Sequence, residues 1–172
     1  MGWLKRVLGD RIPEGFTGTL AGEEHVLSSA PATGGPVVAT SLGLWVPEQA
    51  GFRRMAWHAI SKVTWSESVL TVVESEEIEQ AGNAVVIVDR RPVRYRLPRH
   101  GTLPKVVRDR VDGSIRSRYY KELPGGGAWF VQRKVPGQDG VLLQARPDPG
   151  TDRHVVVDIA REAAERLARE LG

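Results

Sequence analysis

The sequence predicts an α+β protein in which short antiparallel strands are followed by a long amphipathic helix. The stretch from Val37 to Trp65 divides into short β-type runs and holds three of the five tryptophans. Large aromatic side chains bury much apolar surface in a small core. From Leu103 to Leu123 apolar residues recur every four positions, as on one face of a helix. Residues 128–172 add a predicted hairpin, a further strand and a final helix.

Short strands are expected before residue 98 because several segments are rich in β-branched and aromatic residues or alternate between apolar and polar ones. These segments are residues 24–31, 37–40, 43–46, 53–57, 60–65, 69–73, 84–89 and 93–97. The acidic residues 74–83, ESEEIEQAGN, are expected to form a polar loop. In the last strand apolar residues alternate with Arg94 and Arg96, so one face is expected in the core and the other is cationic.

The long helix is predicted to open at Thr102 and to run to Leu123. Thr102 is a residue type preferred at a helix N-cap, and Pro104 lies in the first turn. The apolar stripe consists of Leu103, Val107, Val111, Ile115, Tyr119 and Leu123. Gly113 within it costs about 1 kcal/mol relative to Ala, and Pro124 with the glycines after it ends the helix.

The C-terminal residues show a different pattern of apolar and polar positions. Ala128–Val135 and Val141–Arg146 flank a PGQDG turn, which predicts a hairpin. His154–Ile159 is an apolar run and is predicted as a strand. Ala160–Leu171 is predicted as a final amphipathic helix, with alanines and leucines on its inner face.

The composition limits the function classes. The 172 residues include no cysteine, which excludes disulfides, thiol nucleophiles and thiolate metal sites. No apolar run approaches the roughly 18 residues that cross a bilayer, and the N-terminal residues lack the apolar core of a secretory signal. We therefore expect a cytoplasmic protein, with a peripheral position at the inner membrane as the alternative.

Positive charge is concentrated in one stretch. Residues 90–121 carry 11 Lys and Arg against two acidic residues, although the whole chain has a net charge of only +3. Such a segment attracts acidic proteins, anionic membranes or nucleic acid, unless the arginines are simply solvated surface residues. An N-terminal apolar–basic segment, Trp3–Leu8, is a second possible contact surface. The candidate interaction residues are Trp3, Leu4, Arg94, Arg96, Lys105, Arg108, Arg110, Arg116 and Arg118.

The sequence spacings required for catalysis are not present. There is no G-x-S-x-G motif, and the four histidines lie far apart. Gly125–Gly127 follows the predicted helix instead of preceding one, so it does not form a phosphate-binding loop. Glu23 and Glu24 are expected in a polar loop, where carboxylates keep ordinary properties. No catalytic, cofactor-binding or metal-binding residues are predicted, and the protein is expected not to be an enzyme.

The order of elements resembles a bacterial pleckstrin-homology-like (PH-like) domain over residues 17–123. The residues that carry the resemblance are Thr40, Gly43, Leu44 and Trp45 in one strand pair and Trp57, Ile60, Val63 and Trp65 in the next. The resemblance implies an antiparallel barrel of about seven strands whose open end is closed by the helix. Residues 1–16 then form an N-terminal segment, and 124–172 a β-β-β-α extension that either packs with the barrel or stands as a small added unit.

Related eukaryotic domains bind phosphoinositides through Lys and Arg in the loop between the first two strands. The corresponding loop here, Pro31–Pro36, has no basic residue. The resemblance therefore implies a non-enzymatic module for protein–protein interaction, without cofactor or small-molecule substrate. The first alternative is association with anionic membrane through the basic residues, Trp3 and Leu4. The second is nucleic-acid binding, in which Tyr119 and Tyr120 would stack on bases.

Overall fold

The computed structural model describes residues 12–171, so Trp3 and Leu4 lie outside the described residues. The chain divides into two compact units. Unit 1 consists of residues 1–74 and 91–112, and unit 2 of residues 75–90 and 113–172. Residues 75–90 and 113–123, which belong to the segment that resembles a PH-like domain, therefore lie in unit 2. Both units combine strands with a helix, and the predicted α+β class is confirmed.

The first sheet of unit 1 is antiparallel and follows the chain order β1 (Val26–Ala30), β2 (Val37–Thr40), β3 (Gly43–Glu48) and β4 (Gly51–Ala56). Small and β-branched apolar residues face its core side, as strands prefer. The β1–β2 turn contains two glycines with φ of 87° and 137°, a region that glycine reaches without steric cost. The short 3-10 helix η1 (Trp57–Ala59) connects β4 to the second sheet.

The second sheet of unit 1 has β6 (Val69–Ala81) at its centre, with β5 (Ile60–Ser66) and β8 (Val93–Arg96) antiparallel on either side of its first half. The β5–β6 turn is formed by Glu67 and Ser68, whose φ angles are 51° and 64°. Two consecutive positive φ angles are typical of the tight hairpin turn that matches strand twist.

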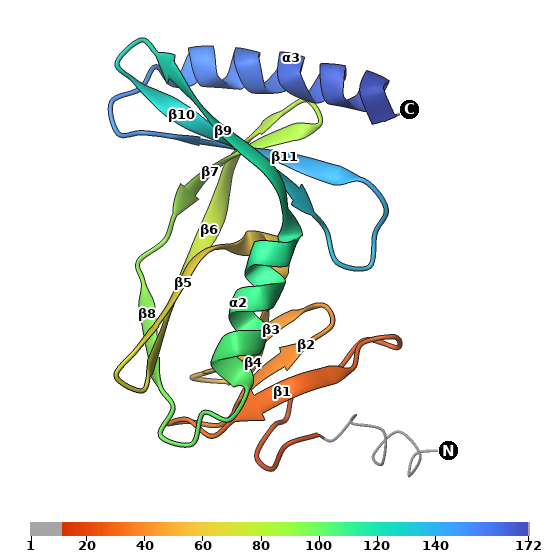
Figure 1. Ribbon diagram of the computed structural model, residues 1–172, viewed down its shortest axis with the longest axis vertical. Coiled ribbons are helices and arrows are strands. Elements are labelled where there is room, and N and C mark those ends of the chain that lie inside the picture. Colours follow the sequence, from red (N-terminus) through yellow and green to blue (C-terminus); the bar gives the residue numbers. More distant parts are fainter. Residues whose placement is uncertain (1–11, 172) are drawn as a thin grey trace. The chain divides into compact units, whose positions relative to one another are not determined.

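Helix α2 (Leu103–Ser114) packs against strands of both sheets of unit 1 (Figure 1). Its buried face is formed by Leu103, Val107 and Val111, which are at most 4% exposed. The strand residues of the same core are Ala30, Val37, Ala39, Leu44, Val46, Met55, Ile60, Leu70 and Val72, together with Trp57 of η1 and Leu97. The apolar stripe of α2 therefore completes one core with both sheets.

The predicted extension of this helix to Leu123 is wrong. The helix ends at Ser114, and Ile115–Leu123 is strand β9, paired with β10 along its length. Gly113 weakens the helix just before this point, and the two tyrosines that follow favour a strand. The four-residue apolar spacing was a coincidence, because the ladder with a later strand decides the local structure.

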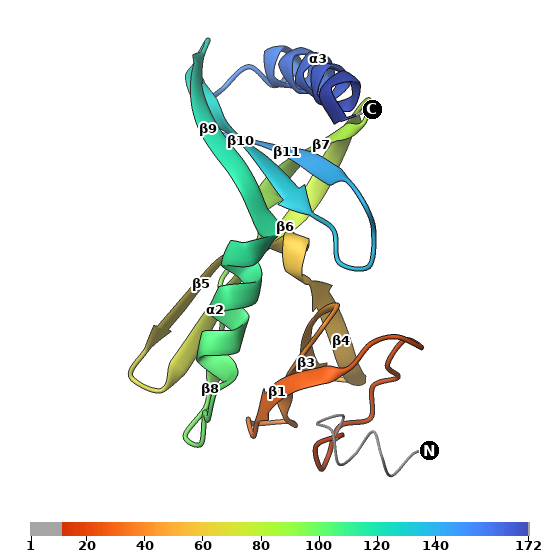
Figure 2. The same cartoon turned by 45° about the vertical axis from the view of Figure 1, so that its right-hand side comes forward.

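Unit 2 is a mixed sheet with the order β6-β7-β11-β10-β9, formed by the second half of β6 with β7 (Ala84–Asp89), β11 (Val141–Pro147), β10 (Gly126–Lys134) and β9. Strand β11 runs parallel to β7, and the other neighbours are antiparallel. Helix α3 (Arg153–Leu171) covers one face of this sheet (Figures 1 and 2). The helix residues in the core of unit 2 are Val156, Val157, Ala160 and Ala164.

Two further predictions in unit 2 are corrected, and one is confirmed. Residues 74–81 are strand, not loop, because they pair with β7 and Ala81 is fully buried. Of the acidic residues, Glu76 and Glu77 are exposed, whereas Glu74 is paired with Arg53. His154–Ile159 is the start of α3, not a strand. The carboxylate of Asp152 accepts hydrogen bonds from the amides of His154 and Val155 at 3.0 and 3.4 Å, and so caps the helix. The predicted hairpin is confirmed as β10 and β11.

Candidate binding surface

A small pocket lies beside the first turns of α2 in unit 1. Its volume is about 270 Å³, and its lining combines aromatic and cationic side chains with a turn glycine and a proline of the helix. The lining residues are Trp65, His100, Gly101, Pro104, Lys105 and Arg108. The Trp65 and His100 rings lie 4.9 Å apart between centroids, at 54° to each other. The pocket therefore has an aromatic wall and a cationic rim.

The local fold explains why these residues meet. Trp65 pairs with Leu70, and Leu70 pairs with Tyr95, so Trp65 lies on the core face of its sheet. The chain then turns at Gly101, whose φ is 53°. The amide of Val106 donates to the carbonyl of Thr102 at 3.0 Å, which places Thr102 at the predicted N-cap.

The side chain of an N-cap residue usually accepts a hydrogen bond from a backbone amide of the first helical turn. The Thr102 side chain has a different partner. Its hydroxyl lies 2.8 Å from that of Ser28 on β1. The hydrogen bond therefore attaches the start of α2 to the first sheet, and the pocket is held by elements of both sheets.

The cations at the rim have weak partners or none. Lys105 contacts Asp109 at 2.6 Å, but the two side chains are 79% and 60% exposed. An exposed pair four residues apart on a helix stabilises by only about 0.3–0.5 kcal/mol. The Arg108 side chain forms no ion pair or hydrogen bond with any residue between 12 and 171. Both cations are therefore available to an anionic group that enters the pocket.

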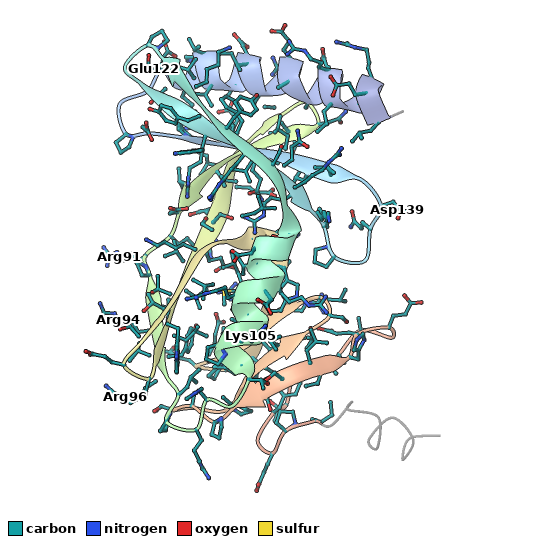
Figure 3. The ribbon with its side chains drawn as sticks, viewed as in Figure 1. Arg91, Arg94, Arg96, Lys105, Glu122 and Asp139 are labelled. Atoms are coloured by element: carbon teal, nitrogen blue, oxygen red, sulfur yellow. The ribbon has the colours of Figure 1, made fainter. Side chains whose placement is uncertain are left out.

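A second group of cations follows β8 in unit 1. Arg94 and Arg96 of the strand and Arg91 of the connection before it project to the same side (Figure 3). Arg94 and Arg96 alternate with Tyr95, which is paired with the buried Leu70. They therefore lie on the face of the sheet opposite to the core and to the Trp65 pocket. The cations of the strand and those of the helix do not form one continuous face.

The other predicted cations are separated further. Arg110 is exposed on α2, whereas Arg116 and Arg118 belong to β9 in unit 2. This separation follows directly from the early end of the helix at Ser114. The structure thus brings together Lys105 and Arg108 with two aromatic residues that were not in the predicted surface. Trp65 was expected only as a core residue and His100 as an isolated histidine, and no motif connects them in the sequence.

A larger hollow adjoins the β1–β2 turn, the loop that was considered above for phosphoinositide binding. It measures about 350 Å³ and is lined mainly by small residues and prolines of residues 13–15, 29–32 and 35–36. Its charged residues are Arg99 and Glu14, whose charges compensate each other. This lining is poorly suited to a phosphorylated head group, which requires several cations.

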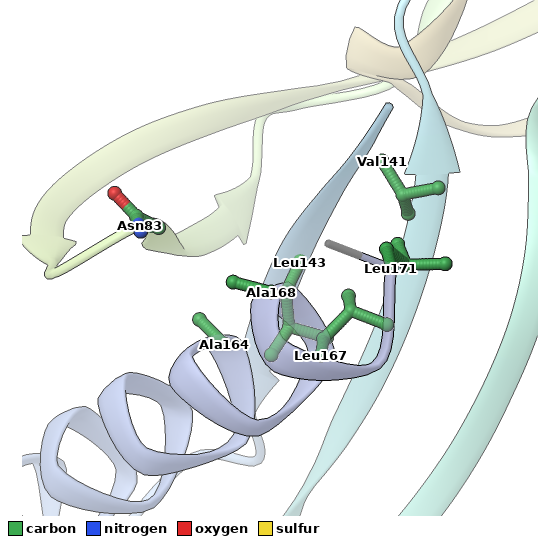
Figure 4. Close-up of a pocket in the computed structure, with 7 residues that line it drawn as sticks. All are labelled: Asn83, Val141, Leu143, Ala164, Leu167, Ala168 and Leu171. Atoms are coloured by element: carbon green, nitrogen blue, oxygen red, sulfur yellow. The ribbon is translucent and has the colours of Figure 1, made fainter. Parts of the chain in front are cut away.

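Unit 2 contains an apolar pocket between the C-terminal turns of α3 and strand β11 (Figure 4). Its volume is about 240 Å³. The lining residues are Asn83, Val141, Leu143, Ala164, Leu167, Ala168 and Leu171. None of them is charged and Asn83 is the one polar residue of the lining, so the pocket offers a ligand few specific polar contacts.

Glu24 is the one acidic residue between 12 and 171 that is buried. Its side chain is fully enclosed and accepts hydrogen bonds from several donors, including Thr40 and Trp45. Glu24 does lie in a loop, just before β1. The expectation that this loop leaves its carboxylate unburied is wrong, because the partners that enclose it come from strands far along the chain. Since its oxygens are already occupied by the protein, Glu24 holds the first sheet together and has no arrangement suited to acid–base catalysis.

No protein-family model, curated protein or solved structure matches the chain. Within residues 12–171, no three His, Asp or Glu side chains gather closely enough to bind a metal ion together. Over the same residues, neither helix combines the length and the hydrophobicity needed to span a bilayer. The function must therefore be argued from the geometry of the surfaces.

Proposed function

We propose that the chain is a non-enzymatic binding module whose unit 1 is a PH-like domain that recognises an acidic segment of a partner protein. The described part of unit 1 holds four strands in one antiparallel sheet, three in a second and a helix after them. Helix residues share one core with strands of both sheets. This order and packing support the PH-like resemblance, in which a helix closes a barrel of about seven strands.

The pocket at the start of α2 carries the proposal. Its cationic rim attracts a carboxylate, and its aromatic wall favours contact with the apolar part of a side chain. A volume of about 270 Å³ accommodates one or two side chains. An acidic residue with an apolar neighbour in an extended partner segment has the matching chemistry.

Affinity purification from the native cell, followed by mass spectrometry, tests the proposal with three baits. These are the wild-type chain, the pocket variant Lys105→Glu/Arg108→Glu and the row variant Arg94→Glu/Arg96→Glu. All four substituted residues are exposed, and both variants change the net charge equally. A partner of the pocket is recovered by the wild type and the row variant but not by the pocket variant, and its binding weakens as salt is raised.

The partner recovered in this way is then purified and titrated directly against the same three chains. The pocket variant should bind at least about tenfold more weakly than the wild type, because two favourable charges become repulsive. Equal binding by the wild type and the pocket variant would remove the pocket as the recognition site.

Anionic membrane is a second candidate, favoured by the arginine row on β8. Arg91, Arg94 and Arg96 are all exposed on one side of the strand, as a flat charged surface requires. Co-sedimentation with vesicles that contain anionic phospholipid distinguishes it from the first proposal. Membrane binding is lost in the row variant and kept in the pocket variant, whereas binding to a partner protein shows the reverse pattern.

A further inference from the structure

Strand β9 is a long and exposed edge strand of unit 2. Among residues 12–171 it pairs with β10 alone and ends the strand order of its sheet. Seven of its nine residues, from Arg116 to Glu122, are exposed. Figure 2 shows it at the outer edge of the sheet. One side of its backbone therefore presents unpaired N–H and C=O groups, which form a template for another strand.

Several devices that usually protect edge strands are missing from β9. Protected edges are often short, interrupted by proline or covered by another element. Strand β9 is longer than the usual 5–6 residues or so, contains no proline and is not covered along its length. Its one interruption is a bulge at Arg116, since Ile115 pairs with Arg133 of β10 and Ser117 pairs with the adjacent Gln132. Its charged residues are of both signs, so they do not simply repel a second strand.

When two copies of β9 are placed antiparallel, the side chains of one copy face complementary side chains of the other. We propose that β9 pairs antiparallel with β9 of a second copy of this chain, about a twofold axis at Tyr119. The facing pairs are Ile115 with Leu123, Arg116 with Glu122, Ser117 with Lys121, Arg118 with Tyr120, and Tyr119 with its own copy. Because the interface is isologous, each unlike pair occurs twice.

Each end of this register gains a favourable contact. Arg116 faces an opposite charge in Glu122, which lies near the turn between β9 and β10 (Figure 3). The outermost residues, Ile115 and Leu123, are both apolar, and Ile115 lies beyond the bulge at Arg116. Opposite charges and apolar pairs that face each other across antiparallel strands stabilise a sheet.

The facing residues also lie on the same face of the sheet. From Ser117 to Leu123, where the ladder with β10 is regular, a twofold axis perpendicular to the sheet keeps each residue on its own face, so even-numbered residues face even-numbered ones. Tyr119 stacks on Phe130 of the α3-side core, with centroids 5.2 Å apart. The contact of Arg118 with Tyr120 therefore lies on the opposite face, where Tyr120 rests against Trp129 at 5.3 Å. A cation over the face of an aromatic ring is favourable.

Neighbouring registers are less favourable. An axis at Arg118 places two arginines face to face. An axis at Tyr120 faces Arg118 with Glu122, but it shortens the ladder, because the partners of Arg116 and Ile115 then lie beyond the end of the strand. An axis between two residues on either side of Tyr119 sets Lys121 opposite Arg116 or Arg118, and like charges that face each other destabilise a sheet.

Sedimentation equilibrium of the full chain over a wide concentration range tests the dimer. The wild type should show a monomer–dimer equilibrium, and Arg116→Glu or Glu122→Arg should each raise the dissociation constant about tenfold or more, because both copies of the pair become repulsive. The double variant Arg116→Glu/Glu122→Arg restores the pairs and should return the dissociation constant close to the wild-type value. Glu165→Arg on the exposed side of α3 is the control and should leave it unchanged.

A wild-type chain that stays monomeric at every concentration would overturn the proposal. A dimer that both single variants leave unchanged would also overturn it, because the interface would then lie elsewhere. Failure of the double variant to recover would reject the Arg116–Glu122 register. All these substitutions are at exposed positions, so each variant should keep the wild-type circular dichroism spectrum.

Crosslinking tests the axis independently of charge. Since the chain has no cysteine, a single Tyr119→Cys substitution places two thiols opposite each other across the axis. In Ser117→Cys the two thiols lie roughly 13 Å apart along the strands, too far for a disulfide. Mild oxidation should link the first variant into dimers and leave the second unlinked. Equal rates for the two variants would overturn the axis at Tyr119.

Discussion

The indole Nε1–H of Trp45 donates a hydrogen bond to Oε2 of Glu24 over 2.9 Å. Thr40 donates to the same carboxylate at 2.5 Å, and the amide of Ala21 at 2.9 Å. The guanidinium of Arg54 completes the set with an ion pair of 2.6 Å, and the Glu24 side chain is 0% exposed. A single carboxylate thus links β2, β3 and β4 to the turn before β1. Buried charges are tolerated only where partners compensate the loss of water, as they do here.

We predict that Glu24→Gln destabilises the protein by about 2–3 kcal/mol. The amide has the size of the carboxylate, but its NH₂ group would face donors where an acceptor is needed, and Arg54 would lose its counter-charge. Urea unfolding followed by tryptophan fluorescence measures the change as a lower midpoint with an unchanged slope. Glu23→Gln, at the exposed neighbouring position, is the matched control. Equal midpoints for the two variants would contradict the structural role of Glu24.

The pH dependence of stability provides a second prediction on the same residue. Burial alone would raise the pKa of Glu24, but the hydrogen bonds from Thr40, Ala21 and Trp45 and the charge of Arg54 outweigh it and lower this pKa below the ordinary 4.5. The ionised form therefore stabilises the fold fully above about pH 4.5. This contribution is lost as the pH falls through the lower pKa of the folded state.

Urea unfolding of the wild type and of Glu24→Gln across this acidic range measures the effect. The difference in free energy of unfolding between the two proteins should narrow steadily as the pH falls below about 4.5. A difference that stays constant over the whole range would mean that Glu24 does not titrate with a lowered pKa.

The sequence predicted most of unit 1 because its local and tertiary signals agree. Strand runs such as Val37–Thr40 match strands of the structure, and the stripe of Leu103, Val107 and Val111 faces the core as expected. The errors occur where a partner far along the chain decides the local structure. Ile115–Leu123 has a helical spacing but pairs with β10.

The candidate pocket was only partly predictable. Lys105 and Arg108 were identified from the charge of their segment, but Trp65 and His100 belong to other elements and meet them only in the folded chain. The burial of Glu24 was missed for the same reason. A local polar context gives no information about donors that arrive from Trp45 and Arg54.

A third prediction concerns Arg53, which links β4 to β6. Its guanidinium binds Glu74 in a bidentate way at 2.8 and 2.9 Å and Glu48 at 2.5 Å. The hydrogen bonds to Glu74, together with the one to Glu48, hold the pKa of Arg53 above its ordinary value despite its partial burial. Arg53→Lys should destabilise the protein by about 1 kcal/mol, because an ammonium cannot reproduce the planar fork. Thermal unfolding should show a lower midpoint than for Arg91→Lys, at an exposed position of the β7–β8 connection, and equal midpoints would contradict the prediction.

The last prediction concerns a close approach between strands β3 and β4 of the first sheet. Gly43 pairs with Ala56, and a Cβ added at Gly43 would lie 2.3 Å from the carbonyl oxygen of Met55. That oxygen belongs to backbone within the sheet, so it cannot move aside without a change in the β3–β4 ladder. We therefore expect Gly43→Ala to destabilise the protein by about 2–4 kcal/mol. Gly22→Ala is the control, since a Cβ there meets nothing within 4 Å. Urea midpoints measure both variants, and a Gly43→Ala protein as stable as the control would show that the two strands separate more easily than their pairing indicates.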